Sequence, residues 1–164
     1  MTAAAAAVSD PQPETSQQFK RILLASEGRE IPDAAVKLAI DLARQSNASV
    51  HVFSIARVHG VAFGLPSPGL LPTKREWAEQ RELVTKAVRR IERKGIDAKG
   101  HVLGTRNATK KIREEAKLEG CDVIVMGADP DRNRVVGNLL WSQEPQRVRR
   151  RAKIPVFLVV EESD

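Results

Sequence analysis

The residues with side chains suited to metal binding or nucleophilic catalysis are few and scattered along the sequence. His51, His59 and His101 have no spacing that would gather metal ligands, so we expect a structural role for each. Cys121 lies far in sequence from any histidine, and we interpret it as a small buried residue. Ser142 has no evident base to activate its hydroxyl. The sequence therefore predicts no catalytic residues and no metal ligands, and we expect a protein that is not an enzyme.

A second group of chemically capable residues lies in the segment 127–142. Arg132 and Arg134 carry planar guanidinium groups of the kind that pair with phosphates. Asp129 and Asp131 offer carboxylate oxygens, which Mg²⁺ prefers as ligands. The simpler interpretation, which we favour, is that all four are solvated loop charges; phosphate binding by the arginines is the alternative.

The composition is that of one domain in a reducing compartment. The chain has 164 residues, of which 41% are hydrophobic and only 4% aromatic, so a core built from aliphatic side chains is expected. A single cysteine excludes an internal disulfide and suits the cytoplasm. No run approaches the ~18 apolar residues of a membrane span. The Ala-rich start lacks a basic region before it and is followed by polar residues and prolines, so residues 1–18 are predicted to be a disordered tail and residues 19–164 the domain.

The net charge of +6 raises the question of nucleic-acid binding. Much of the excess lies between Arg147 and Lys153, at the end of a predicted helix, where the helix dipole favours cations. No recognisable nucleic-acid motif accompanies these charges. We therefore expect no nucleic-acid partner and keep a phosphate-contacting patch as a minor alternative.

Five apolar runs alternate with four amphipathic segments. The first, fourth and fifth runs are nearly continuous, as in strands that are covered on both faces, whereas the third alternates like an edge strand. The runs span residues 21–26, 49–56, 96–103, 122–126 and 154–160. Helices are predicted from Pro32 to Ser46, from Thr73 to Lys94, from a cap at Asn107 to Gly120, and from a cap at Ser142.

This alternation predicts an α/β fold with an open parallel sheet of five strands and helices on both faces. In such a sheet, ligands bind outside the carboxyl ends of the strands, where the connections reverse direction. The segments that reach this edge are residues 26–30, 56–72, 104–107 and 127–142. They are where a binding site is to be sought.

Three stretches of the sequence resemble the universal stress protein family. The run Ile22 to Gly28 (ILLASEG) is similar to the family's first strand and turn, and Cys121 to Gly127 (CDVIVMG) to its fourth. The closing stretch Arg151 to Val160 (RAKIPVFLVV) is similar to the last helix-to-strand passage. The likeness extends from residue 20 to residue 160.

The resemblance implies a Rossmann-like fold with strand order 3-2-1-4-5. It also implies a homodimer that pairs through the last strand, Val156–Val160, and a cleft between the first and fourth strands in which many members bind ATP. The residues that would form this nucleotide site are Ala25, Ser26, Glu27, Ile55, Met126, Gly127, Arg132 and Ser142.

The phosphate-binding loop that the resemblance implies is only partly present here. Nucleotide-binding members carry three glycines followed by Ser or Thr; this chain keeps Gly127 and Ser142, but has Pro130 at the second position and Leu140 or Trp141 at the third. Proline has no N–H to offer a phosphate. We therefore expect a non-catalytic stress-response protein with a degenerate nucleotide loop and no cofactor; an ATP-binding switch, with slow hydrolysis at most, is the alternative.

The connection from Arg57 to Thr73 is long for a strand-to-helix link. It carries several apolar residues among three prolines and three glycines. A lid or a docking surface for a protein partner and a loop packed on its own domain or on a dimer mate are equally compatible with this composition.

Overall fold

The computed structural model describes residues 18–57, 71–129 and 143–161, in which five strands alternate with four helices. Residues 1–17 of the predicted tail and most of the connection from residue 57 to residue 73 lie outside these ranges, as do Arg132, Arg134 and Ser142. The elements are β1 (Arg21–Ser26), α1 (Asp33–Ser46), β2 (Ser49–Arg57), α2 (Lys74–Glu92), β3 (Ala98–Thr105), α3 (Ala108–Leu118), β4 (Val123–Ala128), α4 (Glu144–Arg151) and β5 (Val156–Val160).

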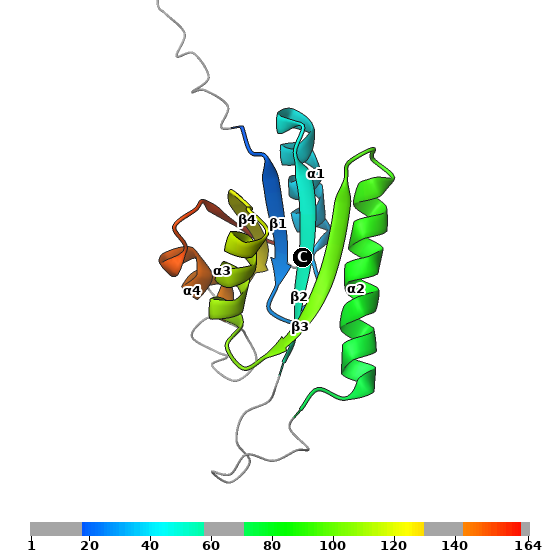
Figure 1. Cartoon of the computed structure of the whole chain (residues 1–164), viewed down its shortest axis with the longest axis vertical. Coiled ribbons are helices and arrows are strands. Elements are labelled where there is room, and N and C mark those ends of the chain that lie inside the picture. Colours follow the sequence, from blue (N-terminus) through cyan, green and yellow to red (C-terminus); the bar gives the residue numbers. More distant parts are fainter. Residues whose placement is uncertain (1–17, 58–70, 130–142, 162–164) are drawn as a thin grey trace, which may run out of the picture.

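All strand pairs are parallel, and the order across the sheet is β3-β2-β1-β4-β5. This confirms the expected Rossmann-like arrangement. Helices α1 and α2 cover one face of the sheet, and α3 and α4 cover the other (Figure 1). The central strands are covered on both faces, which is why β4 is buried along its whole length and β1 at every position after Arg21.

Successive side chains of each strand enter two separate hydrophobic cores. On β1, Ile22 and Leu24 point to the α1–α2 face, whereas Leu23 and Ala25 point to the α3–α4 face. The first core is closed by the apolar stripes of α1 and α2, which include Ala39 and Ile91. The second is closed mainly by Ile112, Ala116 and Val148. Aliphatic side chains fill both cores, as the low aromatic content predicts.

The start of α2 agrees with the local sequence signal, and the start of α4 does not. The Thr73 hydroxyl accepts a hydrogen bond from the backbone N–H of Glu76, whose side chain in turn accepts one from the backbone of Thr73. The predicted start of the last helix is wrong: α4 begins at Glu144, and the residue in the cap position is Gln143 rather than Ser142. Serine was predicted as the cap because its side chain caps helices better than that of glutamine. The side chain of Gln143 makes no cap hydrogen bond in the structure.

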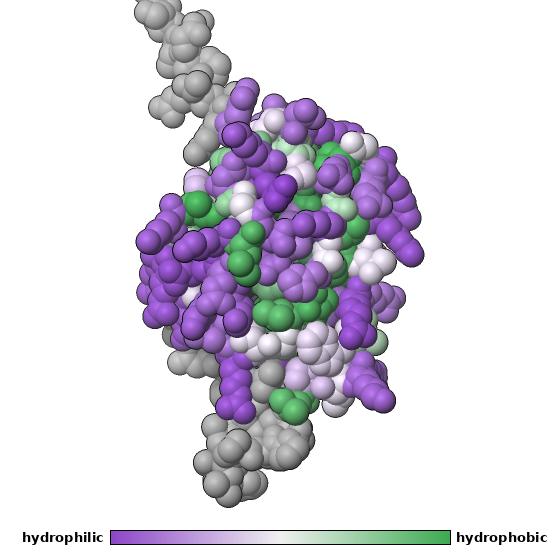
Figure 2. Space-filling model, in the orientation of Figure 1, coloured by the Kyte–Doolittle hydropathy of each residue, from purple (hydrophilic) through white to green (hydrophobic). Residues whose placement is uncertain are grey.

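The two edges of the sheet differ in polarity. The β3 edge, predicted from its alternating pattern, exposes Lys99, Gly100 and His101, whereas β5 exposes Phe157 and Val160 to 39% and 45%. The face shown in Figure 2 is mainly hydrophilic, with hydrophobic side chains exposed between the charged ones near its middle. Within the described residues, no helix has the length and apolarity that crossing a membrane requires.

Candidate functional site

The strand order creates a switch point between β1 and β4. The chain leaves β1 toward β2 on one side, and it reaches β4 only after returning to the other side. The residues predicted to form the site meet here: Ala25 is paired in register with Met126, and the turn after Ser26 lies beside the end of β4.

The predicted site residues that the structure describes are all buried. Glu27 is 1% exposed, Ile55 and Met126 have no exposed surface, and Ala25, Ser26 and Gly127 are buried as well. The apolar side chains among them belong to the core beneath α3 and α4. Their role as nucleotide contacts stays a prediction, as does that of Arg132 and Ser142, which lie outside the described residues.

Arg29 links the two walls of the switch point. Its guanidinium forms a bidentate pair with Asp129 after β4, with Nη1–Oδ1 and Nη2–Oδ2 distances of 3.1 and 3.0 Å. Its Nε donates to Glu27 after β1. Burial acts to lower the pKa of Arg29, but the two carboxylates outweigh this effect and the pKa lies above its usual value. No sequence pattern predicts the pair between Arg29 and Asp129, because these residues are 100 positions apart.

The turn that carries Glu27 is held by several further hydrogen bonds. Arg57 Nε donates to the Glu27 carbonyl over 2.8 Å, and Gln80 Nε2 donates to the Gly28 carbonyl over 3.1 Å. The Ser26 hydroxyl accepts from the N–H of Gly28. The other carboxylate oxygen of Glu27, Oε2, is buried without a hydrogen-bond partner. The acidic residue at this end of β1 is therefore only partly satisfied by the protein.

Pro32 occupies the space over Gly127. A β-carbon on Gly127 would lie 2.6 Å from Pro32 Cγ and 2.8 Å from Pro32 Cδ, so only glycine fits beneath this ring. The close approach of the β1–α1 connection to the end of β4 explains this glycine without any ligand.

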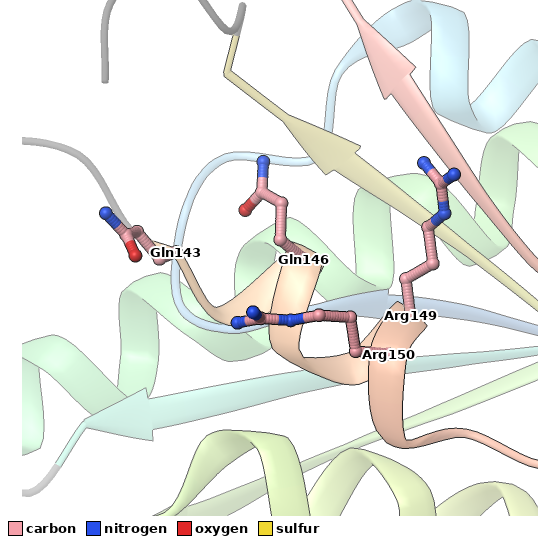
Figure 3. A pocket seen from close by; sticks show the side chains of 4 residues that line it. All are labelled: Gln143, Gln146, Arg149 and Arg150. Atoms are coloured by element: carbon pink, nitrogen blue, oxygen red, sulfur yellow. The ribbon is translucent and has the colours of Figure 1, made fainter. Parts of the chain in front are cut away.

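A pocket of about 330 Å³ lies along α4 and is lined by Gln143, Gln146, Arg149 and Arg150. Figure 3 shows the side chains of Gln146, Arg149 and Arg150 extending from α4 and that of Gln143 from the residue just before the helix. The Gln146 Oε1 atom is buried without a hydrogen-bond partner. Two guanidinium groups and two amides provide donors suited to an anion. These arginines occupy the last turn of α4, where the helix dipole favours cations, as predicted; the phosphate-contacting patch kept as the alternative stays a prediction.

Two of the three histidines lie together, although their spacing in the sequence did not indicate it. His51 on β2 and His101 on β3 both contact the carboxylate of Glu115 on α3. Parallel neighbouring strands are joined by a long crossover, so residues that meet across them have no characteristic spacing in the sequence. His59 lies outside the described residues. Cys121 is buried, as predicted, and burial raises the pKa of its thiol to about 12.

Solved structures of low sequence identity share the fold. A universal stress protein from Archaeoglobus fulgidus is 20% identical, with a TM-score of 0.64, and the match covers 86% of this chain and 93% of that one. A structure described as the Archaeoglobus fulgidus protein in complex with dAMP is 20% identical (TM-score 0.62; 87% and 98% covered). A universal stress protein in complex with cAMP is 19% identical (TM-score 0.62; 89% and 100% covered).

No protein with a curated description matches the sequence. The model of the universal stress protein family, however, matches residues 18–160, which is most of the chain. The fold agrees with this match, since the strand order and the placement of the helices are those expected of the family. The chain therefore belongs to the universal stress protein family.

Proposed function

We propose that this universal stress protein is a non-catalytic regulatory protein whose cleft between β1 and β4 is closed by Arg29 and works without a bound nucleotide. The observation that carries the proposal is the bridge from Glu27 through Arg29 to Asp129. A ligand entering between the two strands would have to displace a guanidinium that is paired on both sides. Breaking such a partly buried pair leaves carboxylates without their counter-charge, at a cost of several kcal/mol.

The polar groups around the cleft support a structural rather than a catalytic role. The Ser26 hydroxyl donates to the backbone carbonyl of Arg29 over 2.5 Å, so its proton is directed to the protein and not to a base. Ser54 likewise donates to Gln80 over 2.5 Å. Each hydroxyl stabilises a turn or a helix contact, and neither is arranged as a nucleophile.

A second candidate function is adenine-nucleotide binding as a switch. It is favoured by the relatives described as complexes with dAMP and cAMP, and by the cationic pocket along α4. In this case Arg29 would release Asp129 and turn toward the phosphates, and Arg149 and Arg150 would contribute further positive charge.

Thermal unfolding with and without nucleotide separates the two candidates. The protein is heated alone, and with millimolar ATP, dAMP or cAMP in the presence of Mg²⁺. A ligand present at 100 times its Kd adds about 2.7 kcal/mol to the free energy of unfolding. We expect no change in Tm with any of the three nucleotides. A reproducible rise in Tm, with a Kd in the micromolar range by calorimetry, would contradict the proposal and establish the second candidate.

A pair of arginine variants then tests the role of Arg29 in either case. Arg29→Ala removes the bridge, and Arg89→Ala, on the exposed side of α2, is the matched control. If nucleotide binds and Arg29 contacts phosphate, only Arg29→Ala weakens binding. If the bridge closes the cleft, only Arg29→Ala lowers Tm without nucleotide, because Glu27 and Asp129 lose their counter-charge.

We further propose that two copies pair through β5. This strand forms an edge of the sheet, and its backbone groups on that side have no neighbouring strand within the described residues. Its side chains Phe157 and Val160 are substantially exposed although both are large and hydrophobic. An exposed apolar edge strand is prone to pair with another strand, and a second copy of the same edge provides a self-complementary partner.

A further inference from the structure

Two histidines and a glutamate converge on the α3 side of the sheet, away from the β1–β4 cleft. The Nε2 atom of His51 lies 2.7 Å from Oε1 of Glu115, and the Nδ1 atom of His101 lies 2.8 Å from the same oxygen. The three potential ligand atoms all lie within 4.8 Å of one another. One carboxylate oxygen thus faces two imidazole nitrogens from two different strands.

From this geometry we propose that His51, His101 and Glu115 bind a divalent transition-metal ion, with Zn²⁺ as the ion that suits them best. Two imidazole nitrogens and one carboxylate oxygen are a donor set that Zn²⁺ accepts, with a fourth position left for water or another ligand. Zn–N and Zn–O bonds of about 2.0–2.2 Å place the donors of a tetrahedral site about 3.3 Å apart. To admit the ion, each of the two histidine nitrogens therefore has to move roughly half an ångström away from Oε1 of Glu115.

The burial of the cluster fixes two ligands and leaves access through the third. His51 and Glu115 have side chains that are 3% and 7% exposed, whereas His101 is 44% exposed. The buried pair is held in place by the sheet and by α3. The exposed ring of His101 provides the route by which an ion from solvent reaches the other two ligands.

One ring nitrogen of the cluster has no hydrogen-bond partner within the described residues. The Nδ1 atom of His51 is buried and has no hydrogen-bond partner. A buried polar atom without a partner costs free energy, and such atoms in native proteins call for an explanation such as an ion or ordered water. When Nε2 binds a metal, the ring proton resides on Nδ1, and this N–H then needs an acceptor such as an ordered water. A cavity of about 170 Å³ lined in part by His51 provides room for a water molecule near the residue.

Two cations near the cluster are held by Glu119. Lys99, next to the cluster on β3, pairs with Glu119 over 2.6 Å, and Arg21 donates to the Glu119 carbonyl. Glu119 follows Glu115 by one helical turn, and its pKa is lowered, first of all by the hydrogen bond from Lys99. The ammonium group of Lys99 is thus paired with a second carboxylate, Glu119, rather than with Glu115.

This site is separate from the cleft between β1 and β4. His51 precedes Ile55 by four positions on β2, which corresponds to about 13 Å along the strand. The cluster thus lies toward the amino ends of the strands, and the cleft at their carboxyl ends. The two sites can be tested independently, and the failure of one proposal leaves the other intact.

Zinc affinity measured by competition with a chromophoric chelator tests the proposal on full-length, tag-free protein. We expect one equivalent of Zn²⁺ to bind with a micromolar or lower Kd, and bound Co²⁺ to give the intense visible bands of a four-coordinate site. His101→Gln and Glu115→Gln should each weaken Zn²⁺ binding at least about 100-fold. Glu114→Gln is the matched control, since Glu114 adjoins Glu115 but pairs with Lys110 and Lys111.

Because Glu115 is buried, its variant must be shown to fold by circular dichroism before its affinity is compared. His101→Gln, at a half-exposed position, tests the same ligand set if Glu115→Gln does not fold. Absence of stoichiometric Zn²⁺ binding by the wild-type protein would overturn the proposal. So would binding that persists unchanged in His101→Gln, or that falls equally in Glu114→Gln.

Discussion

Pro32 packs so closely on Gly127, the second-last residue of β4, that no side chain larger than hydrogen fits at this position. The glycine that most resembles a phosphate-binding residue in the sequence thus has a packing role. It lets the β1–α1 connection lie against β4, and this contact brings Arg29 within reach of Asp129.

We predict that Gly127→Ala destabilises the protein, because the new methyl group lies within 3 Å of the proline ring. Overpacking of this kind costs about 1–3 kcal/mol. Denaturant unfolding measures the loss. In a Pro32→Ala background the same substitution should cost under about 1 kcal/mol, because the ring that it contacts is gone. An equal cost in both backgrounds would show that the contact is not responsible.

The capping box of α2 gives a second stability prediction. Thr73→Ala removes the side-chain acceptor for the Glu76 N–H and should lower the free energy of unfolding by about 1 kcal/mol. Thr85→Ala, at an exposed position within the same helix, is the matched control and should be neutral or slightly stabilising. Equal effects of the two substitutions in a urea titration would contradict a capping role.

Cys121 should react slowly with alkylating reagents. Burial raises the pKa of its thiol to about 12, so at pH 8 the reactive thiolate is about a thousandfold scarcer than for an ordinary cysteine. The rate of reaction with iodoacetamide, compared between native protein and protein in guanidinium chloride, measures this difference. A native rate within about tenfold of the unfolded rate would mean that the thiol is accessible and ionises normally.

The same shift makes the protein sensitive to high pH. The folded state holds the thiol proton more tightly than the unfolded state does, so this contribution to stability is fully present below pH 9. It is lost as the pH rises toward about 12. Cys121→Ala should flatten this part of the stability profile, as measured by denaturant midpoints from pH 8 to pH 11.

The proposed dimer predicts that a charge on β5 yields monomers. Phe157→Lys and Val160→Lys each place an ammonium group on the exposed apolar edge. Leu118→Lys is the control, because Leu118 is 81% exposed on α3 and lies on a different element. Light scattering should give dimer mass for the wild type and the control, and monomer mass for both β5 variants. A wild-type monomer, or dimers in all four proteins, would contradict pairing through β5.

The helices and strands could be predicted because each of them has a recognisable pattern in its own stretch of sequence. Continuous apolar runs marked the buried strands, and Thr73 and Asn107 marked the starts of two helices. The alternating pattern of the third run identified the edge strand. The strand order came from the family resemblance, because nothing in any single element determines which strand lies beside which.

The polar contacts between different elements could not be predicted from such patterns, because they join residues that are distant in sequence. Arg29 and Asp129 are separated by 100 positions, and His51 and Glu115 by 64. Each pair depends on which strands and helices become neighbours and on the register between them. A sequence pattern reports the face on which a residue lies, but not which side chain from another element meets it there.

The unequal edges of the sheet limit how far copies of this protein can join. If two molecules pair through β5, each covers the apolar edge of its sheet within the described residues. The combined sheet would then end on both sides in β3, where Lys99 and His101 are exposed. A further strand would have to pair with this more polar edge, so the proposed pairing predicts assemblies of two molecules and no fibre.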